Sequence, residues 1–144
     1  MNGMFYEEAP AVDIRQYDNY YEPDILPIYE AVGWTAYTQY PDLLKAAFMC
    51  SLLTYVAYVD GRIVGVARAV GDELTVVLIQ DILVLPEYQG RGIGKMLLQA
   101  MLTRYQRVRQ VFVVTDDTEK TVGFYESMGM KPFESVSLRG FIRA

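Results

Sequence analysis

The sequence predicts an α/β (α+β) fold in which helices pack on the faces of a mixed sheet. Segments with the alternating polarity of strands are interleaved with segments whose apolar residues recur with the period of a helix. The chain has 144 residues, of which 52% are hydrophobic and 22% are charged, and this composition is typical of one globular domain. We therefore expect a single domain over residues 1–144.

One strand and two helices are predicted in the first third of the chain. Residues 12–17 alternate apolar and polar side chains, which predicts a strand. Residues 23–33 predict a short helix that a glycine ends. Residues 41–49 predict a second helix with proline in its first turn.

Three strands are predicted next. Residues 53–59 and 63–70 are rich in β-forming residues, and they flank Asp60-Gly61, a pair that favours a tight type I′ hairpin. Residues 75–85 form a long apolar run that ends at proline, which predicts a strand buried on both faces.

The last third of the chain alternates helices and strands. Residues 93–108 place their apolar side chains on one face of a helix, and residues 111–114 predict a short strand. Residues 118–127 predict a helix with Gly129 as its end signal. Residues 133–142 predict one or two final strands.

Charge and residue usage argue against several classes of function. The chain has 13 Lys and Arg against 18 Asp and Glu, so its acidic surface disfavours nucleic acid. It has no histidine, which removes the commonest general base and most zinc sites, so we expect no metal. The single cysteine, Cys50, forms no internal disulfide, and the expected compartment is the cytoplasm. No apolar run is long enough to span a membrane, and residues 1–8 lack the pattern of a secretory signal, so we expect no membrane partner.

The segment between the long apolar strand and the following helix contains three alternating glycines, Gly90, Gly92 and Gly94. Glycines at the start of a helix leave backbone N–H groups bare, so that a phosphate approaches closely and meets the positive end of the helix dipole. Arg91 and Lys95 add positive charge there. The segment therefore predicts a phosphate or pyrophosphate site rather than a plain turn.

Two common phosphate-binding patterns do not fit this loop. A dinucleotide-binding pattern that begins at Gly90 requires glycine at position 95, where the chain has Lys95. A Walker loop that ends at Gly94-Lys95 requires glycine at position 89 and Ser or Thr at position 96, where the chain has Gln89 and Met96. Both patterns are therefore set aside.

The pattern that fits is Gln89-x-x-Gly92-x-Gly94, directly after Val84-x-Pro86. It resembles the pyrophosphate loop of the GNAT superfamily of acyl-CoA N-acyltransferases, and this resemblance extends from about residue 53 to residue 130.

A second block supports the resemblance. Residues 124–130 are similar to the Phe-Tyr-Glu-x-x-Gly-Phe segment of the family, with Met130 in place of the usual Phe. The two blocks occur in the family's order and on the expected elements.

The resemblance implies the GNAT fold, a mixed and mostly antiparallel central sheet with a splayed pair of strands and helices on both faces. It implies acetyl-CoA as co-substrate, bound in the slot between the splayed strands, and no metal. The acetyl group is expected to pass directly to a primary amine of a small molecule or peptide. The residues implied to bind the cofactor are Ile82, Leu83, Val84, Gln89, Gly90, Arg91, Gly92, Ile93, Gly94, Lys95, Thr118 and Phe124.

Two residues are candidates for catalysis. Tyr125 matches the family position that protonates the leaving thiolate, whose conjugate acid has a pKa of about 8.5. Asp81 is the candidate base that takes the proton of the amine, and a buried structural contact is an equally good explanation of a carboxylate in an apolar strand. The neighbouring Gln80 is able only to orient a water. Alternation places Gln80 and Asp81 on opposite faces of the strand unless a bulge intervenes.

In this family the acceptor pocket is usually walled by the segment that corresponds to residues 32–40. Trp34 and Tyr37 lie there, and their rings suit an amine through cation–π contact, while a hydrophobic plug between helices is the alternative for Trp34. With Gln80 they are the candidate substrate-binding residues. Residues 81–84 also resemble the arylalkylamine acetyltransferases of plants. Thr118 departs from the family, because many relatives carry Asn there, about seven residues before the tyrosine.

Alternative functions stay open at this stage. The missing Asn and the uncertain base favour a non-catalytic acyl-CoA-binding sensor or regulatory module. A nucleotide-binding regulatory domain is disfavoured by the failed Rossmann and Walker patterns. The tyrosines near the N-terminus predict either a homodimer surface or a local cluster, and they are Tyr6, Tyr17, Tyr20 and Tyr21.

Overall fold

The computed structural model describes residues 11–144 of the chain. The segment examined for a secretory signal, and Tyr6 of the N-terminal tyrosines, lie outside the described residues. The chain forms two compact units, one that ends at Phe112 and one that comprises residues 113–144.

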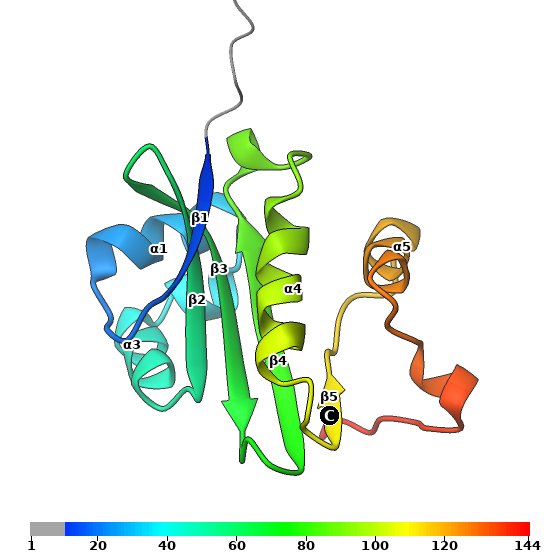
Figure 1. Ribbon diagram of the computed structural model, residues 1–144. Helices are drawn as coiled ribbons and strands as arrows, with labels where there is room; N and C mark the ends of the chain where they lie inside the picture. The colour runs from blue at the N-terminus through cyan, green and yellow to red at the C-terminus, as the bar shows by residue number, and fades with distance from the viewer. Residues whose placement is uncertain (1–10) are drawn as a thin grey trace, which may run out of the picture. The chain divides into compact units, whose positions relative to one another are not determined.

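The first unit is built on a five-stranded sheet with the strand order β1-β2-β3-β4-β5 (Figure 1). The first four strands are antiparallel neighbours, whereas β5 runs parallel to β4. The sheet is therefore mixed and mostly antiparallel, as the sequence predicts. The strands are β1 (Val12–Gln16), β2 (Leu53–Val59), β3 (Arg62–Gly71), β4 (Val76–Val84) and β5 (Gln110–Phe112).

Helices cover both faces of this sheet. Helix α4 packs on one face, where an added Cβ at Gly65 of β3 would lie 3.0 Å from Leu97. Helices α1 and α2 cover the other face, which carries Arg68 and Asp81. The α-helices of this unit are α1 (Glu22–Ala31), α2 (Thr35–Thr38), α3 (Pro41–Met49) and α4 (Ile93–Arg104), and the 3-10 helix η1 (Pro86–Tyr88) follows β4.

The turn between β2 and β3 has the predicted form. Asp60 and Gly61 both have positive φ angles, 50° and 75°, as a type I′ hairpin requires. This turn fixes the antiparallel register in which Val59 pairs with Arg62.

Strand β4 is paired along only part of its outer edge. Its first three residues, Val76–Leu78, pair with β5, and β4 then continues alone on that side to Val84. Among the described strands, only β3 pairs with the second half of β4. The second half of β4 therefore has no strand partner on its outer edge among the described strands.

The second unit contains helix α5 (Glu119–Ser127) and the 3-10 helix η2 (Phe133–Val136). The prediction of one or two strands over residues 133–142 is wrong. Pro132 precedes a 3-10 turn, and Ser137 has a φ of 61°, which breaks an extended run. The apolar residues that suggested a strand are therefore not organised by a ladder, and Phe141 is 93% exposed.

Three smaller differences concern the first unit. The short helix α2 has no counterpart in the predicted elements, and the helix predicted over residues 93–108 ends at Arg104. Strand β4 is not buried on both faces, because Leu78 and Ile82 are half-buried and Gln80 is exposed. Gln80 is thus the exposed residue at the centre of β4.

Candidate functional site

The glycine loop leads from β4 into α4 through two left-handed residues. Gly90 and Gly92 have φ angles of 78° and 80°, and Gly92 is the N-cap of α4. An added Cβ at either position would meet nothing within 4 Å. The loop therefore requires glycine for its backbone conformation and not for lack of space.

The start of α4 is open to an anion. The N-cap makes no side-chain hydrogen bond, and the first turn contains no acidic residue. The first helical bond in this turn runs from the N–H of Met96 to the carbonyl of Gly92, at 3.0 Å. The N–H groups of residues 93–95 consequently lack intrahelical partners, and they lie at the positive end of the helix dipole.

Side chains hold the loop against the end of the strand. The Nε2 of Gln89 donates a hydrogen bond to the carbonyl of Val84, at 3.0 Å. The Tyr88 ring lies near two guanidinium groups, with 5.1 Å to Arg91 and 6.0 Å to Arg62. The predicted cofactor residues from Val84 to Lys95 are thus connected within one segment, and Arg91 and Lys95 are exposed.

The backbone of β4 presents polar groups at its unpaired edge. The N–H of Leu85 donates to the carbonyl of Val64 in β3, at 2.8 Å. Because the polar groups of successive strand residues point to opposite edges, those of Ile82 and Val84 face away from β3. The edge of β4 therefore directs the N–H and C=O of Ile82 and the N–H of Val84 outward before the glycine loop, while the carbonyl of Val84 accepts from Gln89.

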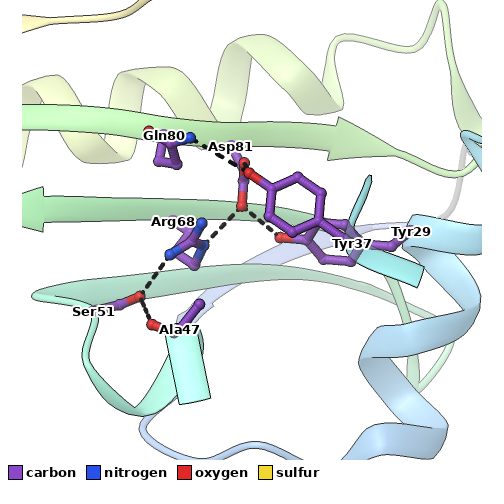
Figure 2. Close-up of polar contacts among 7 residues, drawn as sticks. All are labelled: Tyr29, Tyr37, Ala47, Ser51, Arg68, Gln80 and Asp81. Atoms are coloured by element: carbon purple, nitrogen blue, oxygen red, sulfur yellow. Dashed lines mark hydrogen bonds and ion pairs between the residues drawn. The ribbon is translucent and has the colours of Figure 1, made fainter. Parts of the chain in front are cut away.

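On the other face of the sheet, Asp81 is the centre of a buried hydrogen-bond network (Figure 2). Its side chain is 1% exposed. Oδ2 accepts from Nε of Arg68 at 2.7 Å and from the hydroxyl of Tyr29 at 2.8 Å, and Oδ1 accepts from the hydroxyl of Tyr37 at 3.0 Å. The carboxylate is therefore both paired with a charge and hydrogen-bonded, as its burial requires.

Arg68 connects this network to α3. Its Nη1 donates to the hydroxyl of Ser51 at 3.1 Å, and Ser51 donates to the carbonyl of Ala47 at 2.6 Å. Burial lowers the pKa of Arg68, but the Asp81 carboxylate more than offsets this effect and the pKa is raised. Burial and the same carboxylate raise the pKa of Tyr29 far above its ordinary value, so its hydroxyl remains a donor.

The sequence did not identify Tyr29, Arg68 and Ser51 as members of the site. A signal for Arg68 was present, because a carboxylate in an apolar strand needs a charged partner and Arg68 is the basic residue inside the neighbouring apolar run. The strand register pairs Arg68 with Asp81 directly.

A bulge in β4 brings Gln80 and Asp81 to the same neighbour. The register passes from Arg68 opposite Asp81 to Ala69 opposite Ile79, which leaves Gln80 as the extra residue. The hydroxyl of Tyr37 donates to Asp81 and accepts from Nε2 of Gln80 at 3.4 Å. The structure thus contains the bulge that was the condition for the two side chains to meet.

The predicted substrate residues Trp34 and Tyr37 belong to an aromatic cluster of Tyr29, Trp34, Tyr37 and Phe48. The rings of Trp34 and Tyr37 are stacked, with centroids 6.0 Å apart and planes at 29°. Tyr29 contacts the other three rings at centroid distances between 5.3 and 6.0 Å. Trp34 and Tyr37 are half-buried, so this pair also borders the surface.

The remaining predicted residues belong to the second unit. Thr118 is the N-cap of α5, and its hydroxyl accepts from the N–H of Thr121 at 3.2 Å. The rings of Phe124 and Tyr125 meet edge to face, 4.9 Å apart. Tyr125 is half-buried, and burial together with the charge of Asp116 raises the pKa of its phenol.

Other features of the described residues bear less on this site. Within residues 11–144, no group of three or more acidic, histidine or cysteine side chains is placed to hold a metal. None of the helices in that range combines the length and apolarity that crossing a membrane requires. A cavity of about 370 Å³ lies between α1 and the β2–β3 hairpin. Its lining contains none of the predicted site residues and comprises Pro23, Asp24, Pro27, Ile28, Tyr58, Gly61, Arg62, Ile63 and Leu85.

Comparison with known proteins identifies relatives of this arrangement. A GNAT-family acetyltransferase of Streptococcus pneumoniae has 36% sequence identity and a TM-score of 0.84, over 93% of this chain and 98% of that one. An aminoglycoside N-acetyltransferase solved with CoA, AAC(6′)-Iy, shares the fold at 18% identity with a TM-score of 0.71, over 97% of each chain.

Curated sequences match over a smaller share of their length. An uncharacterised N-acetyltransferase, ycf52, of the red alga Gracilaria tenuistipitata is 26% identical over 74% of this chain and 59% of its own length. A histone acetyltransferase, TAP1, of Glycine max is 29% identical over 75% of this chain and 51% of its own. The chain thus spans about half the length of these curated relatives.

A family model places these similarities in one group. The model of the acetyltransferase (GNAT) domain matches residues 51–132, which is more than half of the chain. The matched segment includes β4, the glycine loop and α5. The chain belongs to the GNAT family of acetyltransferases.

Proposed function

We propose that the protein transfers an acetyl group from acetyl-CoA directly to a primary amine of a small molecule or peptide. One observation carries the proposal: the unpaired edge of β4 leads through left-handed glycines to the uncapped start of α4. An extended pantetheine arm needs backbone partners, and a pyrophosphate needs bare N–H groups. The segment supplies both in the order in which CoA requires them.

Acetyl-CoA is proposed to bind along this segment. The pyrophosphate would lie against residues 89–95, with Arg91 and Lys95 adding charge. The backbone of Ile82 and Val84 would pair with the pantetheine, and Leu83 lies between them. A backbone N–H at this edge would stabilise the oxyanion that forms when the amine attacks the thioester. The complex of AAC(6′)-Iy with CoA supports this choice of co-substrate.

Residues 1–144 are proposed to act as one domain. The family match runs through the boundary between the two units, from residue 51 to residue 132. Tyr125 would then protonate the thiolate, because a phenol with a raised pKa keeps its proton at neutral pH. Thr118 and Phe124 would contact the cofactor from the same helix.

The acceptor is proposed to lie against Trp34, Tyr37 and Gln80, and Asp81, the candidate base, would act on the amine only through Tyr37. The relatives support both acceptor types, since one is named for aminoglycosides and another for histones. The cytoplasm remains the proposed compartment on account of the single cysteine, although one Arabidopsis relative is named chloroplastic. A homodimer through the N-terminal tyrosines remains part of the proposal.

The test is a calorimetric titration of the full chain with acetyl-CoA, with CoA and ATP as comparators. Micromolar binding of acetyl-CoA and much weaker binding of ATP are expected. Thiol release is then measured with tryptamine, spermidine and a lysine peptide as acceptors. Absence of binding to both CoA species would overturn the proposal. Binding without thiol release from any amine would instead support a non-catalytic acyl-CoA sensor.

A further inference from the structure

Asp81 is too deeply buried to meet a substrate. Its side chain is 1% exposed, and three donors occupy its two oxygens. One of these donors, Tyr37, also reaches the surface, because it is half-buried and its hydroxyl contacts the exposed Gln80. Tyr37 therefore connects the buried carboxylate to the exposed Gln80 of β4 (Figure 2).

The position of the Tyr37 proton follows from its partner. A carboxylate only accepts hydrogen bonds, so the hydroxyl of Tyr37 must donate to Oδ1 of Asp81 at 3.0 Å. The phenol oxygen is then left to act as an acceptor on its outer side. The contact from Gln80 at 3.4 Å is long for a hydrogen bond, so a closer donor is able to take its place.

Arg68 and Tyr29 hold the Asp81 carboxylate in the orientation in which Oδ1 faces Tyr37. Arg68 and Tyr29 both donate to Oδ2, which leaves Oδ1 for Tyr37. Arg68 is itself anchored to Ser51. The carboxylate is therefore held from two directions and does not turn away from Tyr37.

We propose that Tyr37 accepts a hydrogen bond from the N–H of the attacking amine, and that Asp81, which Arg68 and Tyr29 hold in place, is the positioning residue that fixes the polarity of Tyr37. The inference rests on the proposed acetyltransferase function. It concerns orientation and adds no covalent step. An N–H bond to Tyr37 aims the nitrogen lone pair toward the acetyl group, and it selects acceptors that present a donor.

The decisive variant is Asp81→Asn. The oxygen of the introduced carboxamide would remain with Arg68 and Tyr29, which are donors, so its NH2 group would face Tyr37. The phenol oxygen of Tyr37 would then accept a hydrogen bond from this NH2 group, and the hydroxyl proton of Tyr37 would point toward the amine. We expect kcat/KM for tryptamine to fall at least about tenfold, because the hydroxyl of Tyr37 and the N–H of the amine are both donors and cannot hydrogen-bond through these protons.

A matched variant separates the polarity of Tyr37 from the packing around it. Tyr29→Phe removes one hydrogen bond from Oδ2 of the same carboxylate but leaves Oδ1 as an acceptor facing Tyr37. We expect it to lower kcat/KM by at most about threefold, measured where all variants are folded. A purely structural network would instead rank Asp81→Asn and Tyr29→Phe by their loss of melting temperature.

Tyr37→Phe removes the hydroxyl that is proposed to contact the amine and keeps the Arg68–Asp81 ion pair. We expect at least about a tenfold loss of kcat/KM for tryptamine and for a lysine peptide, with the calorimetric affinity for acetyl-CoA unchanged. Full turnover of this variant, or equal losses in Asp81→Asn and Tyr29→Phe, would overturn the inference. If the unaltered chain binds acetyl-CoA and acetylates neither probe, both the inference and the proposed reaction are wrong. If it fails to bind acetyl-CoA, the fault lies in the proposed cofactor site.

Discussion

Arg68 and Asp81 lie opposite each other in β3 and β4, and their side chains form a buried ion pair at 2.7 Å beside the bulge at Gln80. The side chains are 5% and 1% exposed. The bulge and the ion pair occur together, so the local irregularity of β4 is stabilised from the neighbouring strand.

Removal of Arg68 is expected to destabilise the fold strongly. Arg68→Met leaves the Asp81 carboxylate buried without a charged partner, which costs about 3–5 kcal/mol. In an Asp81→Asn background the same substitution should cost less, because no negative charge remains buried. Urea unfolding of the two single variants and the double variant measures this coupling. Equal costs of Arg68→Met in both backgrounds would show that the pair contributes no coupling.

The glycine loop makes a second prediction. Gly92→Ala places a side chain at a φ of 80°, which costs about 1–2 kcal/mol and displaces the N–H groups at the start of α4. We expect acetyl-CoA to bind about tenfold more weakly in calorimetry, since a helix terminus binds an anion through those groups. Gly123→Ala is the matched control, because this glycine has an ordinary φ and nothing within 4 Å of an added Cβ. The control should keep full affinity, and a matching loss there would contradict the role of the loop.

Tyr125 provides a prediction about pH. If its phenol protonates the thiolate, Tyr125→Phe lowers kcat about 100-fold. Burial and Asp116 raise the pKa of this group, so the acid form persists through neutral pH and its contribution is lost only above about pH 10. The profile of kcat against pH should show that alkaline fall in the unaltered protein and lack it in the variant. Tyr105→Phe is the control, and an equal fall in kcat there would remove the special role of Tyr125.

The turn before β4 provides a prediction about stability. Asp72 accepts hydrogen bonds from the backbone N–H groups of Leu74, Thr75 and Val76 at 2.7 to 3.0 Å and also one from the hydroxyl of Thr75. The Thr75 hydroxyl and these N–H groups lower the pKa of the Asp72 carboxyl well below its ordinary value.

A lowered pKa in the folded state stabilises the fold above the unfolded pKa of about 3.9, and the effect disappears as the pH falls through the folded pKa. Asp72→Asn should therefore lower the melting temperature at pH 7, and the difference should shrink in thermal melts below about pH 4. A difference that stayed constant from pH 7 to pH 2 would contradict this explanation.

Much of the fold could be predicted because the deciding signals are local. The Asp60-Gly61 turn, the proline at the start of α3 and the apolar period of α4 each depend on a few neighbouring residues. The prediction of strands over residues 133–142 was wrong because a strand depends on more than local sequence. These residues have apolar content, but a strand also needs a partner strand from elsewhere in the chain.

The candidate site likewise has one part that depends on local sequence and one part that depends on residues far apart in the chain. The glycine loop is one continuous segment, so its spacing predicted a phosphate site and the resemblance to the family named its residues. The network around Asp81 joins α1, α2 and β3 to β4, and its members are 13 to 52 residues from Asp81 in sequence. Tyr29 has no local sequence feature that indicates this role, and Arg68 is indicated only by being the basic residue in the neighbouring apolar run. The bulge that places Gln80 depends on the register of two strands.

The half-paired strand β4 has a consequence for the protein without its ligand. An unpaired edge of backbone donors and acceptors is a template for another polypeptide, and natural sheets usually protect such edges. If acetyl-CoA pairs with this edge, it forms the backbone hydrogen bonds that a neighbouring strand would otherwise form. Saturation with acetyl-CoA should then suppress self-association of the protein on warming, so that the co-substrate also protects the protein from aggregation.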